Sequence, residues 1–433
     1  MEKLIIDGGK RLCGEIAVRG AKNAVLPLMA ASLLSDGVCK ITNVPALNDI
    51  KMMAHLMRII GSRIDFENST LTIDNRYCSF FEAPYELVSK MRASIYVLSP
   101  LLARFGKARV SLPGGCAIGA RPIDLHLKAL EKMGAVLNIE HGYINARLKK
   151  NQTSRIKDKE RRNTARFQGA DIFFDKASVG ATVTVLLAAV TAEGETRIIN
   201  AALEPEIGAV VEFLQKMGAK ISGSGTSELV VQGVEKLSPV AEAVIPDRIE
   251  AGTFLIAAAL TRGDVKLTNV IPEHLAALIE KLEEAGCFIE KGKDWLRLTI
   301  DKKPQAVSIT TKPYPGFPTD LQAQFTSLMA LSEGISIVEE TIFSERFHHI
   351  PELNRLDADI VLEGDKAIIK GVKQLSGAEV MATDLRASAA LVLAGLAAQG
   401  VTTISRIYHL DRGYEKMEKK LNKLGASIKR INV

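Results

Sequence analysis

The stretch EGETRIINAALEPEIGAVVEFLQKMGA, from Glu193 to Ala219, carries the pattern on which the fold is built. In residues 195–199 apolar and polar side chains alternate, which is typical of a half-buried strand. Residues 209–217 have apolar side chains at helical spacing and charged side chains between them. Gly218 then follows, and glycine is the residue that ends a helix best. The stretch predicts a strand followed by an amphipathic helix.

This pattern occurs six times in the chain, each copy beginning at a glycine. These glycines are Gly37, Gly106, Gly194, Gly263, Gly334 and Gly400, at steps of 69, 88, 69, 71 and 66 residues. Only the second step is long, and it contains the basic segment 147–166, which we interpret as an insertion into a regular array. In the fifth copy Asp357 replaces the second glycine, so we expect that helix to end differently.

A stretch that is apolar nearly all round precedes each first glycine and predicts a buried helix. Its polar residues gather at the N-terminal end, where unpaired backbone N–H groups carry a partial positive charge. If the six ends converge, they form an anion site to which three cations contribute; simple capping and solvation is the alternative. The polar residues are Lys22 and Asn23, Arg92 and Ser94, Ser178 and Thr182, Glu250 and Thr253, Asp320 and Gln322, and Asp384, Arg386 and Ser388, the three cations being Lys22, Arg92 and Arg386.

The composition limits the classes of protein to consider. A chain of 433 residues with 47% hydrophobic side chains suggests two or more domains with full cores. We expect no transmembrane helix and no signal peptide. Five cysteines without a CxxC pair favour a reducing cytoplasm and argue against a disulfide framework or a zinc site. The segment 147–166 has a net charge of +7, which leaves −1 for the rest of the chain; we interpret it as a solvated loop, with an acidic partner as the alternative.

Seven motifs in sequence order closely resemble those of the UDP-N-acetylglucosamine 1-carboxyvinyltransferase family. They are GAKNA (20–24), PGGCAIGARPIDLH (113–126), DKASVGATVT (175–184), PDRIEAGTF (246–254), FPTDLQAQF (317–325), MATDLRAS (381–388) and RIYHLDRGYE (406–415). The resemblance implies a two-domain inside-out α/β barrel with three βαβαββ units in each domain. The upper domain would span 22–244, the lower domain 1–21 and 245–433, and the active site would lie in the cleft between them.

The resemblance also implies a reaction. The family transfers the enolpyruvyl group of phosphoenolpyruvate to the 3-hydroxyl of UDP-N-acetylglucosamine, and phosphate leaves after a tetrahedral intermediate has formed. This is the first committed step of peptidoglycan synthesis in the bacterial cytoplasm. It needs no metal and no organic cofactor, which agrees with the lack of a His/Cys/carboxylate cluster in the sequence.

Catalytic roles follow from the resemblance, residue by residue. Cys116, in a glycine-rich mobile loop, would deliver a proton to the donor and can add to it covalently, which makes it the expected target of fosfomycin. Asp320, whose position also suits a helix N-cap, would take the proton of the sugar hydroxyl. Lys22, Arg121 and Arg412 would hold the phosphate and carboxylate of phosphoenolpyruvate, Asn23 would contact the tetrahedral centre, and Arg92, Asp384 and Arg386 would support the site.

The remaining implied contacts are with the sugar nucleotide. Besides Asp320, these residues are Arg92, Arg121, Pro122, Ile123, Asp124, Leu125, Lys176, Ser178, Val179, Gly180 and Ile342. The chain departs from many relatives at Asn48, where they have a lysine, so one positive charge near the cleft is missing.

Three other functions remain open on the sequence alone. The chain could be a 5-enolpyruvylshikimate-3-phosphate synthase, although that enzyme lacks a comparable cysteine loop. It could be a non-catalytic sugar-nucleotide binding protein, although Cys116, Asp320, Lys22 and Arg412 are all retained. It could bind nucleic acid through the segment 147–166.

Overall fold

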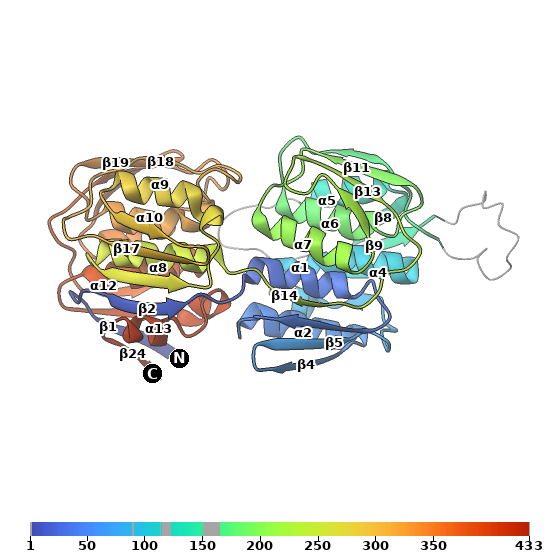
Figure 1. Cartoon of the computed structure of the whole chain (residues 1–433), viewed down its shortest axis with the longest axis horizontal. Helices are drawn as coiled ribbons and strands as arrows, with labels where there is room; N and C mark the ends of the chain where they lie inside the picture. Colours follow the sequence, from blue (N-terminus) through green and yellow to red (C-terminus); the bar gives the residue numbers. More distant parts are fainter. Residues whose placement is uncertain (1, 89–90, 113, 115–122, 150–164, 433) are drawn as a thin grey trace, which may run out of the picture. The chain divides into compact units, whose positions relative to one another are not determined.

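The computed structural model describes residues 2–88, 91–112, 114, 123–149 and 165–432. The chain divides into two compact units (Figure 1). The terminal unit contains the described residues of Met1–Ala21 and Pro246–Val433, and the central unit contains those between Lys22 and Ile245.

The described residues of each unit form three four-stranded sheets. Those of the central unit have the orders β14-β3-β5-β4, β6-β7-β9-β8 and β10-β11-β13-β12, and those of the terminal unit β22-β23-β1-β24, β2-β15-β17-β16 and β18-β19-β21-β20. In the central unit the strands are β3 (Val38–Thr42), β4 (Arg63–Glu67), β5 (Thr70–Asp74), β6 (Glu82–Ala83), β7 (Lys107–Ser111), β8 (Ala135–Glu140), β9 (Tyr143–Leu148), β10 (Asp171–Phe173), β11 (Glu195–Ile199), β12 (Lys220–Ser222), β13 (Glu228–Gln232) and β14 (Ala241–Ala243). In the terminal unit they are β1 (Glu2–Asp7), β2 (Cys13–Ala17), β15 (Asp264–Thr268), β16 (Phe288–Lys291), β17 (Trp295–Thr299), β18 (Ile309–Thr310), β19 (Ile335–Glu339), β20 (Asp359–Glu363), β21 (Lys366–Lys370), β22 (Glu379–Met381), β23 (Val401–Ser405) and β24 (Ile428–Asn432).

All six sheets share one pairing scheme, which the quoted stretch illustrates. Strand β10 pairs in parallel with β11, β11 pairs antiparallel with β13, and β12 joins β13 in a hairpin. Helices α6 (Val179–Ala189) and α7 (Pro205–Lys216) make the two crossovers, so the unit is βαβαββ. The alternation in β11 buries Thr196 and Ile198 and exposes Glu195 and Arg197. The predicted six-fold repetition is therefore confirmed.

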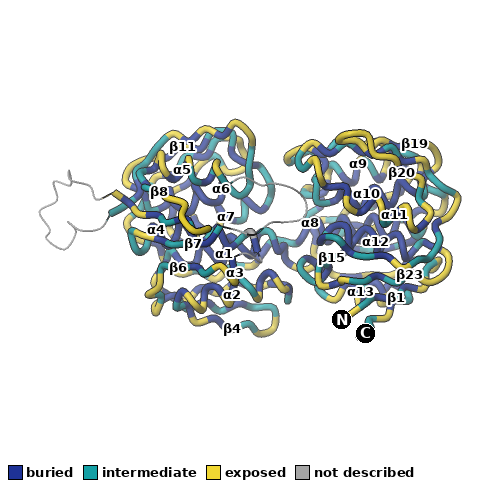
Figure 2. Tube along the Cα trace, turned by 180° about the vertical axis from the view of Figure 1, so that it is seen from behind, coloured by how far each residue is buried: buried dark blue, intermediate teal, exposed yellow. Residues whose placement is uncertain are grey.

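One helix of each repeat is buried, as its apolar sequence predicts. These inner helices are α1 (Lys22–Ser32), α4 (Leu98–Phe105) and α6 in the central unit, and α8 (Arg248–Leu260), α10 (Gln322–Met329) and α12 (Leu385–Ala397) in the terminal unit. Figure 2 shows α10 and α12 as dark, buried segments, and every residue of α8 is buried. No helix in the described part of the chain combines the length and the apolar composition that a membrane span requires.

The other helices are amphipathic and lie further out. They are α2 (Asn48–Ile60), α5 (Asp124–Lys132), α7, α9 (Ala276–Glu284), α11 (Ile350–Asn354) and α13 (Met417–Lys423), with the short α3 (Tyr85–Val88) beside them. Before α4 the chain forms a 3₁₀ helix, η1 (Arg92–Val97), instead of continuing one α-helix. Pro100 lies in the first turn of α4 and lacks the N–H that a continuous α-helix would use to bond the carbonyl four residues earlier.

Two strands belong to a different unit from the helix that follows them in the chain. Strand β2 precedes α1, but it pairs in parallel with β15 of the terminal unit. Strand β14 precedes α8, but it pairs in parallel with β3 of the central unit. The sheet that contains β3 thus receives its edge strand, β14, from the C-terminal end of the central unit. The sheet that contains β15 receives its edge strand, β2, from the N-terminal part of the chain, and both units have three complete sheets.

The outer helices end with one shared backbone conformation. The residues after them have positive φ angles of 110° at Gly61, 93° at Gly134, 105° at Gly218, 91° at Gly286, 65° at Asp357 and 100° at Gly425. The expectation that Asp357 ends its helix differently is therefore wrong. Aspartate, like asparagine, enters this left-handed region more readily than most residues, so it replaces the glycine without a change of geometry.

Candidate active site

Asp320 lies where the chain enters the inner helix α10 of the terminal unit. Residues Thr319–Leu321 form a 3₁₀ turn, η4, after Pro318, and α10 continues from Gln322. Leu321 turns into the core and is fully buried, whereas the side chain of Asp320 remains 26% exposed. This start of the helix therefore presents a carboxylate at the surface of the unit.

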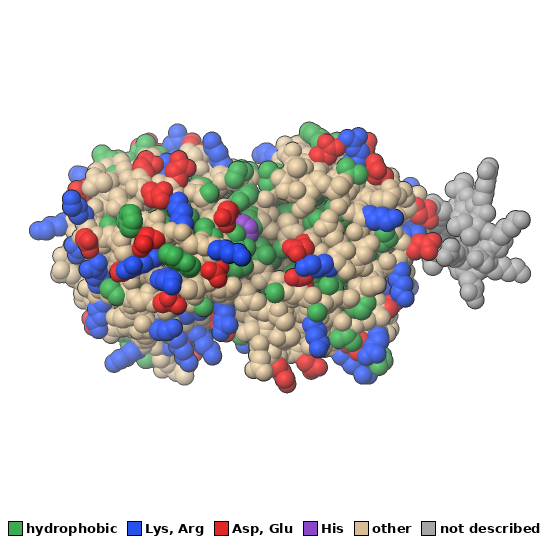
Figure 3. All heavy atoms as spheres, viewed as in Figure 1, with side chains coloured by type: hydrophobic (Ala, Val, Ile, Leu, Met, Phe, Trp, Pro, Cys, Tyr) green, Lys and Arg blue, Asp and Glu red, His purple; other side chains and the backbone are tan. Residues whose placement is uncertain are grey.

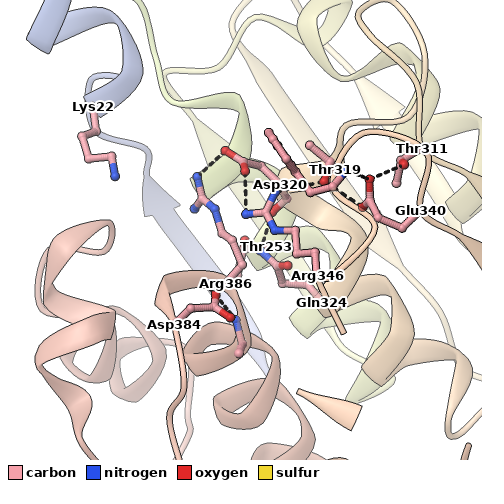
Figure 4. A network of polar contacts seen from close by, with 12 residues as sticks. Lys22, Thr253, Thr311, Thr319, Asp320, Gln324, Glu340, Arg346, Asp384 and Arg386 are labelled. Carbon is pink, nitrogen blue, oxygen red and sulfur yellow. Dashed lines mark hydrogen bonds and ion pairs between the residues drawn. The ribbon is translucent and has the colours of Figure 1, made fainter. Parts of the chain in front are cut away.

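Two arginines hold the Asp320 carboxylate, one on each oxygen (Figure 4). Arg346 Nη2 lies 2.8 Å from Oδ1, and Arg386 Nη2 lies 2.8 Å from Oδ2. Burial opposes ionisation of this carboxyl, but the positive charges of Arg386 and Arg346 outweigh it and hold the pKa of Asp320 well below its usual range. The group is therefore a carboxylate at neutral pH.

A buried polar cluster orients Arg386. Asp384 caps helix α12, its Oδ1 accepting hydrogen bonds from the backbone N–H groups of Arg386 (2.8 Å) and Ala387 (3.0 Å). The guanidinium of Arg386 also donates to the hydroxyl of Tyr414 at 3.1 Å, and Gln324 donates to the same hydroxyl at 3.1 Å. The predicted supporting residues Asp384 and Arg386 thus lie next to Asp320.

The N-terminal ends of the three inner helices meet within the terminal unit. Thr253 of α8 accepts a hydrogen bond from Gln324 of α10, at 3.1 Å, and Arg386 of α12 contacts Asp320 before α10. In this arrangement the charge of Arg386 is compensated by Asp320.

Lys22 is the first residue of α1 in the central unit, and Asn23 is the second. The ammonium group of Lys22 lies 3.2 Å from a carboxylate oxygen of Asp49, and the two side chains are only 10% and 8% exposed. A cation at the first residue of a helix is opposed by the helix dipole, and here the carboxylate of Asp49 offsets its charge. Asn48 is exposed beside Asp49 at the start of α2.

The two segments expected to contact the sugar nucleotide lie side by side in the central unit. Helix α5 begins at Asp124, directly after Ile123, and packs against α6. Ser178 caps α6, its hydroxyl accepting from the N–H of Ala181 at 3.3 Å, and Val179 and Gly180 form the first turn. Leu125 is half-buried next to Asp124, and Lys176 is exposed two residues before the cap.

Gly180 is held against His126 of α5. A Cβ atom at Gly180 would lie 2.7 Å from Nε2 of His126, which is closer than any real contact of that kind. We expect Gly180→Ala to lower the free energy of unfolding by about 1–2 kcal/mol, because the packed histidine must shift. Urea unfolding measures this loss, and calorimetry should show weaker binding of UDP-N-acetylglucosamine by the same variant.

Gly208 on α7 is the matched control for Gly180. It also lies inside a helix of the central unit, but no atom outside its own helix lies within 4 Å of a Cβ built there. Gly208→Ala should stabilise the fold by about 0.5–1 kcal/mol, because alanine has the higher helix propensity. Equal effects of the two substitutions would contradict the packing argument.

The structure describes only some of the other predicted site residues. Arg412 ends the 3₁₀ helix η5 (Ile407–Arg412), and Ile342 lies in the loop after β19, its N–H donating to Glu340 at 2.8 Å. Arg92 begins η1, but its side chain is not among those described. Cys116, Arg121 and Pro122 lie outside the described residues, as does most of the basic segment, residues 150–164.

Four residues at these positions were not predicted: Asp49, His126, Glu340 and Arg346. His126 stands at the end of the motif 113–126, but no role was assigned to it, and the other three lie outside the seven motifs. Arg346 stands next to Glu345 in the loop after β19, but this pair has no spacing that would mark a functional site.

Comparison with known proteins defines the class of this fold and site. The family model of EPSP synthase (3-phosphoshikimate 1-carboxyvinyltransferase) matches residues 6–421. The enolpyruvyl transferase NikO from Streptomyces tendae has a TM-score of 0.87 and 26% identity, covering 100% of this chain and 99% of its own. EPSP synthase from Acinetobacter baumannii shares the fold, with a TM-score of 0.74 and 20% identity over the full length of both chains. The fold is that of the enolpyruvyl transferases, as predicted.

Sequence relatives identify the branch of this class. The UDP-N-acetylglucosamine 1-carboxyvinyltransferase of Desulfosudis oleivorans is 52% identical over 431 residues, and that of Trichlorobacter lovleyi is 53% identical over 432 residues. Both matches cover 100% of each chain. The chain belongs to the UDP-N-acetylglucosamine 1-carboxyvinyltransferase family, and the resemblance seen in its seven motifs is confirmed.

Proposed function

We propose that this protein transfers the enolpyruvyl group of phosphoenolpyruvate to the 3-hydroxyl of UDP-N-acetylglucosamine, with release of phosphate. The relatives that are about 52% identical over the whole chain are named for this reaction. The observation that carries the proposal on the structural side is the Asp320 carboxylate, fixed between Arg346 and Arg386. The reaction forms a tetrahedral intermediate and begins peptidoglycan synthesis. We place it in the cytoplasm, where a catalytic thiol stays reduced.

Asp320 is proposed to accept the proton of the sugar hydroxyl. Its low pKa keeps it deprotonated before the reaction, but it also makes the carboxylate a weak base. It therefore takes the proton only as the new C–O bond forms and the hydroxyl becomes more acidic. Until then, the carboxylate orients the hydroxyl by accepting its hydrogen bond.

The donor is proposed to be held by cations. Its phosphate and carboxylate together carry more negative charge than one side chain can balance, so Lys22, Arg121 and Arg412 are assigned to it. Asn23 is assigned to the tetrahedral centre, and Arg92 supports the negative charge of the substrates. Cys116 is proposed to deliver the proton that the methylene carbon of the donor gains, and to add to the donor covalently.

The nucleotide is assigned to the paired helix starts of the central unit. The N–H groups of Val179 and Gly180 lie in the first turn of α6, where backbone donors have no partner in the helix and suit a diphosphate. Ser178, Lys176 and the segment from Arg121 to Leu125 complete this side. Ile342 of the terminal unit is assigned to the uridine and the sugar.

Phosphate release from phosphoenolpyruvate tests the proposal directly. UDP-N-acetylglucosamine and shikimate 3-phosphate are offered as separate acceptors, since the family model and one solved neighbour are named for the second reaction. We expect release with UDP-N-acetylglucosamine only. Release with shikimate 3-phosphate alone would replace the proposed acceptor. Binding of UDP-N-acetylglucosamine without release would leave a sugar-nucleotide binding protein.

The thiol is tested by Cys116→Ala in the same assay. We expect turnover to fall by about 10²–10⁴-fold, which is the usual contribution of a positioned proton donor. Cys13→Ala is the control, because Cys13 is an exposed free cysteine that lies on β2 and has no proposed role. Full turnover in the Cys116→Ala variant would remove this residue from the mechanism.

A further inference from the structure

Glu340 is a buried carboxylate of the terminal unit to which the proposed reaction gives no role. It follows strand β19 directly and is only 1% exposed. In the described part of the chain no lysine or arginine forms an ion pair with it, so hydrogen-bond donors alone satisfy its charge. Burying such a group is costly unless every acceptor position is used. The arrangement of its donors therefore indicates what it holds in place.

One oxygen of Glu340 fixes the loop that contains Ile342. Its Oε1 accepts hydrogen bonds from the hydroxyl of Thr311 at 2.7 Å and from the N–H groups of Ile342 at 2.8 Å and Phe343 at 3.0 Å. Two consecutive backbone donors on one carboxylate oxygen leave little freedom for the loop. The position of Ile342, assigned above to the substrate, thus depends on this oxygen.

The other oxygen of Glu340 reaches Asp320 through two side chains (Figure 4). The hydroxyl of Thr319 lies 2.7 Å from Oε2, and Nη1 of Arg346 donates to the same hydroxyl at 3.0 Å. A guanidinium only donates and a carboxylate only accepts, so the proton of Thr319 must point to Glu340. This fixes Arg346 in the orientation in which its Nη2 contacts Asp320.

We propose that Glu340 is a positioning residue that sets the proton acceptor and the substrate loop together. Through Thr319 and Arg346 it aims the Asp320 carboxylate, and through Oε1 it places Ile342. The proposal rests on the function assigned to Asp320 above. We call the contacts from Oε2 through Thr319 to Arg346 the Thr319 arm, and the contacts from Oε1 to the backbone of Ile342 and Phe343 the loop arm. The proposal predicts that loss of the Thr319 arm lowers kcat, and that loss of the loop arm raises the KM for UDP-N-acetylglucosamine.

Thr319→Val tests the first arm, because it removes the hydroxyl and keeps the shape of the side chain. We expect kcat to fall by about 10–100-fold, since a displacement of about 1 Å of a catalytic group can cost 10²-fold. The KM for UDP-N-acetylglucosamine should stay within a factor of about three, because the bonds from Oε1 to the loop remain. Thr319→Ser restores the hydroxyl and should restore kcat.

Glu340→Ala tests both arms at once. It frees the N–H groups of Ile342 and Phe343 as well as Thr319, so kcat should fall and the KM for UDP-N-acetylglucosamine should rise. Glu340→Gln separates the arms again. Its amide oxygen can still serve the three donors on the Oε1 side, while its NH₂ group faces Thr319 and cannot accept the hydroxyl proton. The hydroxyl oxygen of Thr319 can still accept from Arg346, but the acceptor that oriented its proton is lost. We therefore expect kcat to fall by less than in Thr319→Val, with the KM for UDP-N-acetylglucosamine unchanged.

The neighbouring pair Glu339 and Thr310 provides a matched control. The hydroxyl of Thr310 donates to Oε2 of Glu339 at 2.9 Å, as that of Thr319 does to Glu340. Glu339 also pairs with Lys366 at 3.4 Å, and neither residue of the control pair contacts Asp320 or Arg346 in the described structure. Glu339→Gln and Thr310→Val should therefore leave kcat and KM unchanged.

Crystal structures of the wild type and Thr319→Val give a readout that does not need turnover. We expect the distance from Arg346 Nη2 to Asp320 Oδ1 to increase beyond ion-pair range in the variant. An unchanged ion pair, or equal kinetics of Thr319→Val and Thr310→Val, would overturn the proposal. A wild-type protein without turnover would instead refute the proposed function, and the structures would still decide the role of Glu340.

Discussion

Asp320→Asn is expected to lower kcat by about 10³-fold, within the range that a positioned general base contributes. Asparagine keeps the size of the side chain but cannot take the hydroxyl proton. It also leaves Arg346 and Arg386 without the negative charge that each contacts at 2.8 Å. Phosphate release under saturating substrates measures this change.

The same substitution should change the stability of the protein in a way that depends on pH. The pKa of Asp320 is lower in the folded protein than in the unfolded chain, so the ionised group stabilises the fold above its unfolded pKa. This stabilisation is lost only as the pH falls through the lower, folded pKa. At pH 7 we expect Asp320→Asn to lower the free energy of unfolding by about 2–3 kcal/mol, with less of this difference remaining in acid.

Asp264→Asn is the control for Asp320→Asn. Asp264 is also held by an arginine, with two contacts of 2.8 Å to Arg297, but it begins strand β15. This variant should turn over at the wild-type rate. If Asp320→Asn kept more than about a tenth of the activity, Asp320 would not be the proton acceptor.

Lys22→Met is expected to reduce kcat/KM by about 10²–10³-fold, the loss typical of a group that stabilises developing charge. It also leaves Asp49, which is 6% exposed, without the partner 3.2 Å away. Removing one member of a buried ion pair costs about 3 kcal/mol or more, so the variant should also be destabilised. Phosphate release and urea unfolding measure the two effects separately.

The double substitution Lys22→Met and Asp49→Asn separates catalysis from stability. It removes both charges, so much of the lost stability should return, because no uncompensated charge stays buried. Activity should remain at the level of the single variant, since no cation is restored. Recovery of activity together with stability would show that Lys22 serves the fold and has no part in the reaction.

Local periodicity predicted most of the fold. The strand and helix of each repeat are encoded within about 30 residues. Apolar side chains alternate with polar ones in the strand and recur every three or four residues in the helix, so the two patterns are easily told apart. Periodicity could not predict the exchange of β2 and β14 between sheets, because each of these strands stands next to a helix in the sequence and pairs with a distant strand. Only the family resemblance grouped residues 1–21 with 245–433. Asp357 was misjudged because residue type alone does not fix φ at a helix end.

The candidate site was predictable only in part, for a similar physical reason. Asp320 and Lys22 stand in motifs that resemble those of the family, so the resemblance implied their roles. Arg346, Glu340 and Asp49 gain theirs from contacts between distant residues, such as the Lys22–Asp49 ion pair across 27 positions. The pKa of Asp320 likewise depends on Arg386, which is 66 residues away in the sequence.

The place of β1 in the terminal unit has a consequence for synthesis on the ribosome. Strand β1 lies between β23 and β24, and its Asp7 pairs with Val401, roughly 400 residues later. At synthesis rates of about 5–20 residues per second, β1 waits roughly 20–80 s for its neighbours. The central unit, one continuous segment with its own three sheets, can fold during that time. The terminal unit instead cannot complete this sheet until β23 and β24 have been made, so Leu4 and Ile6 of β1, which the finished sheet buries, wait without their cover.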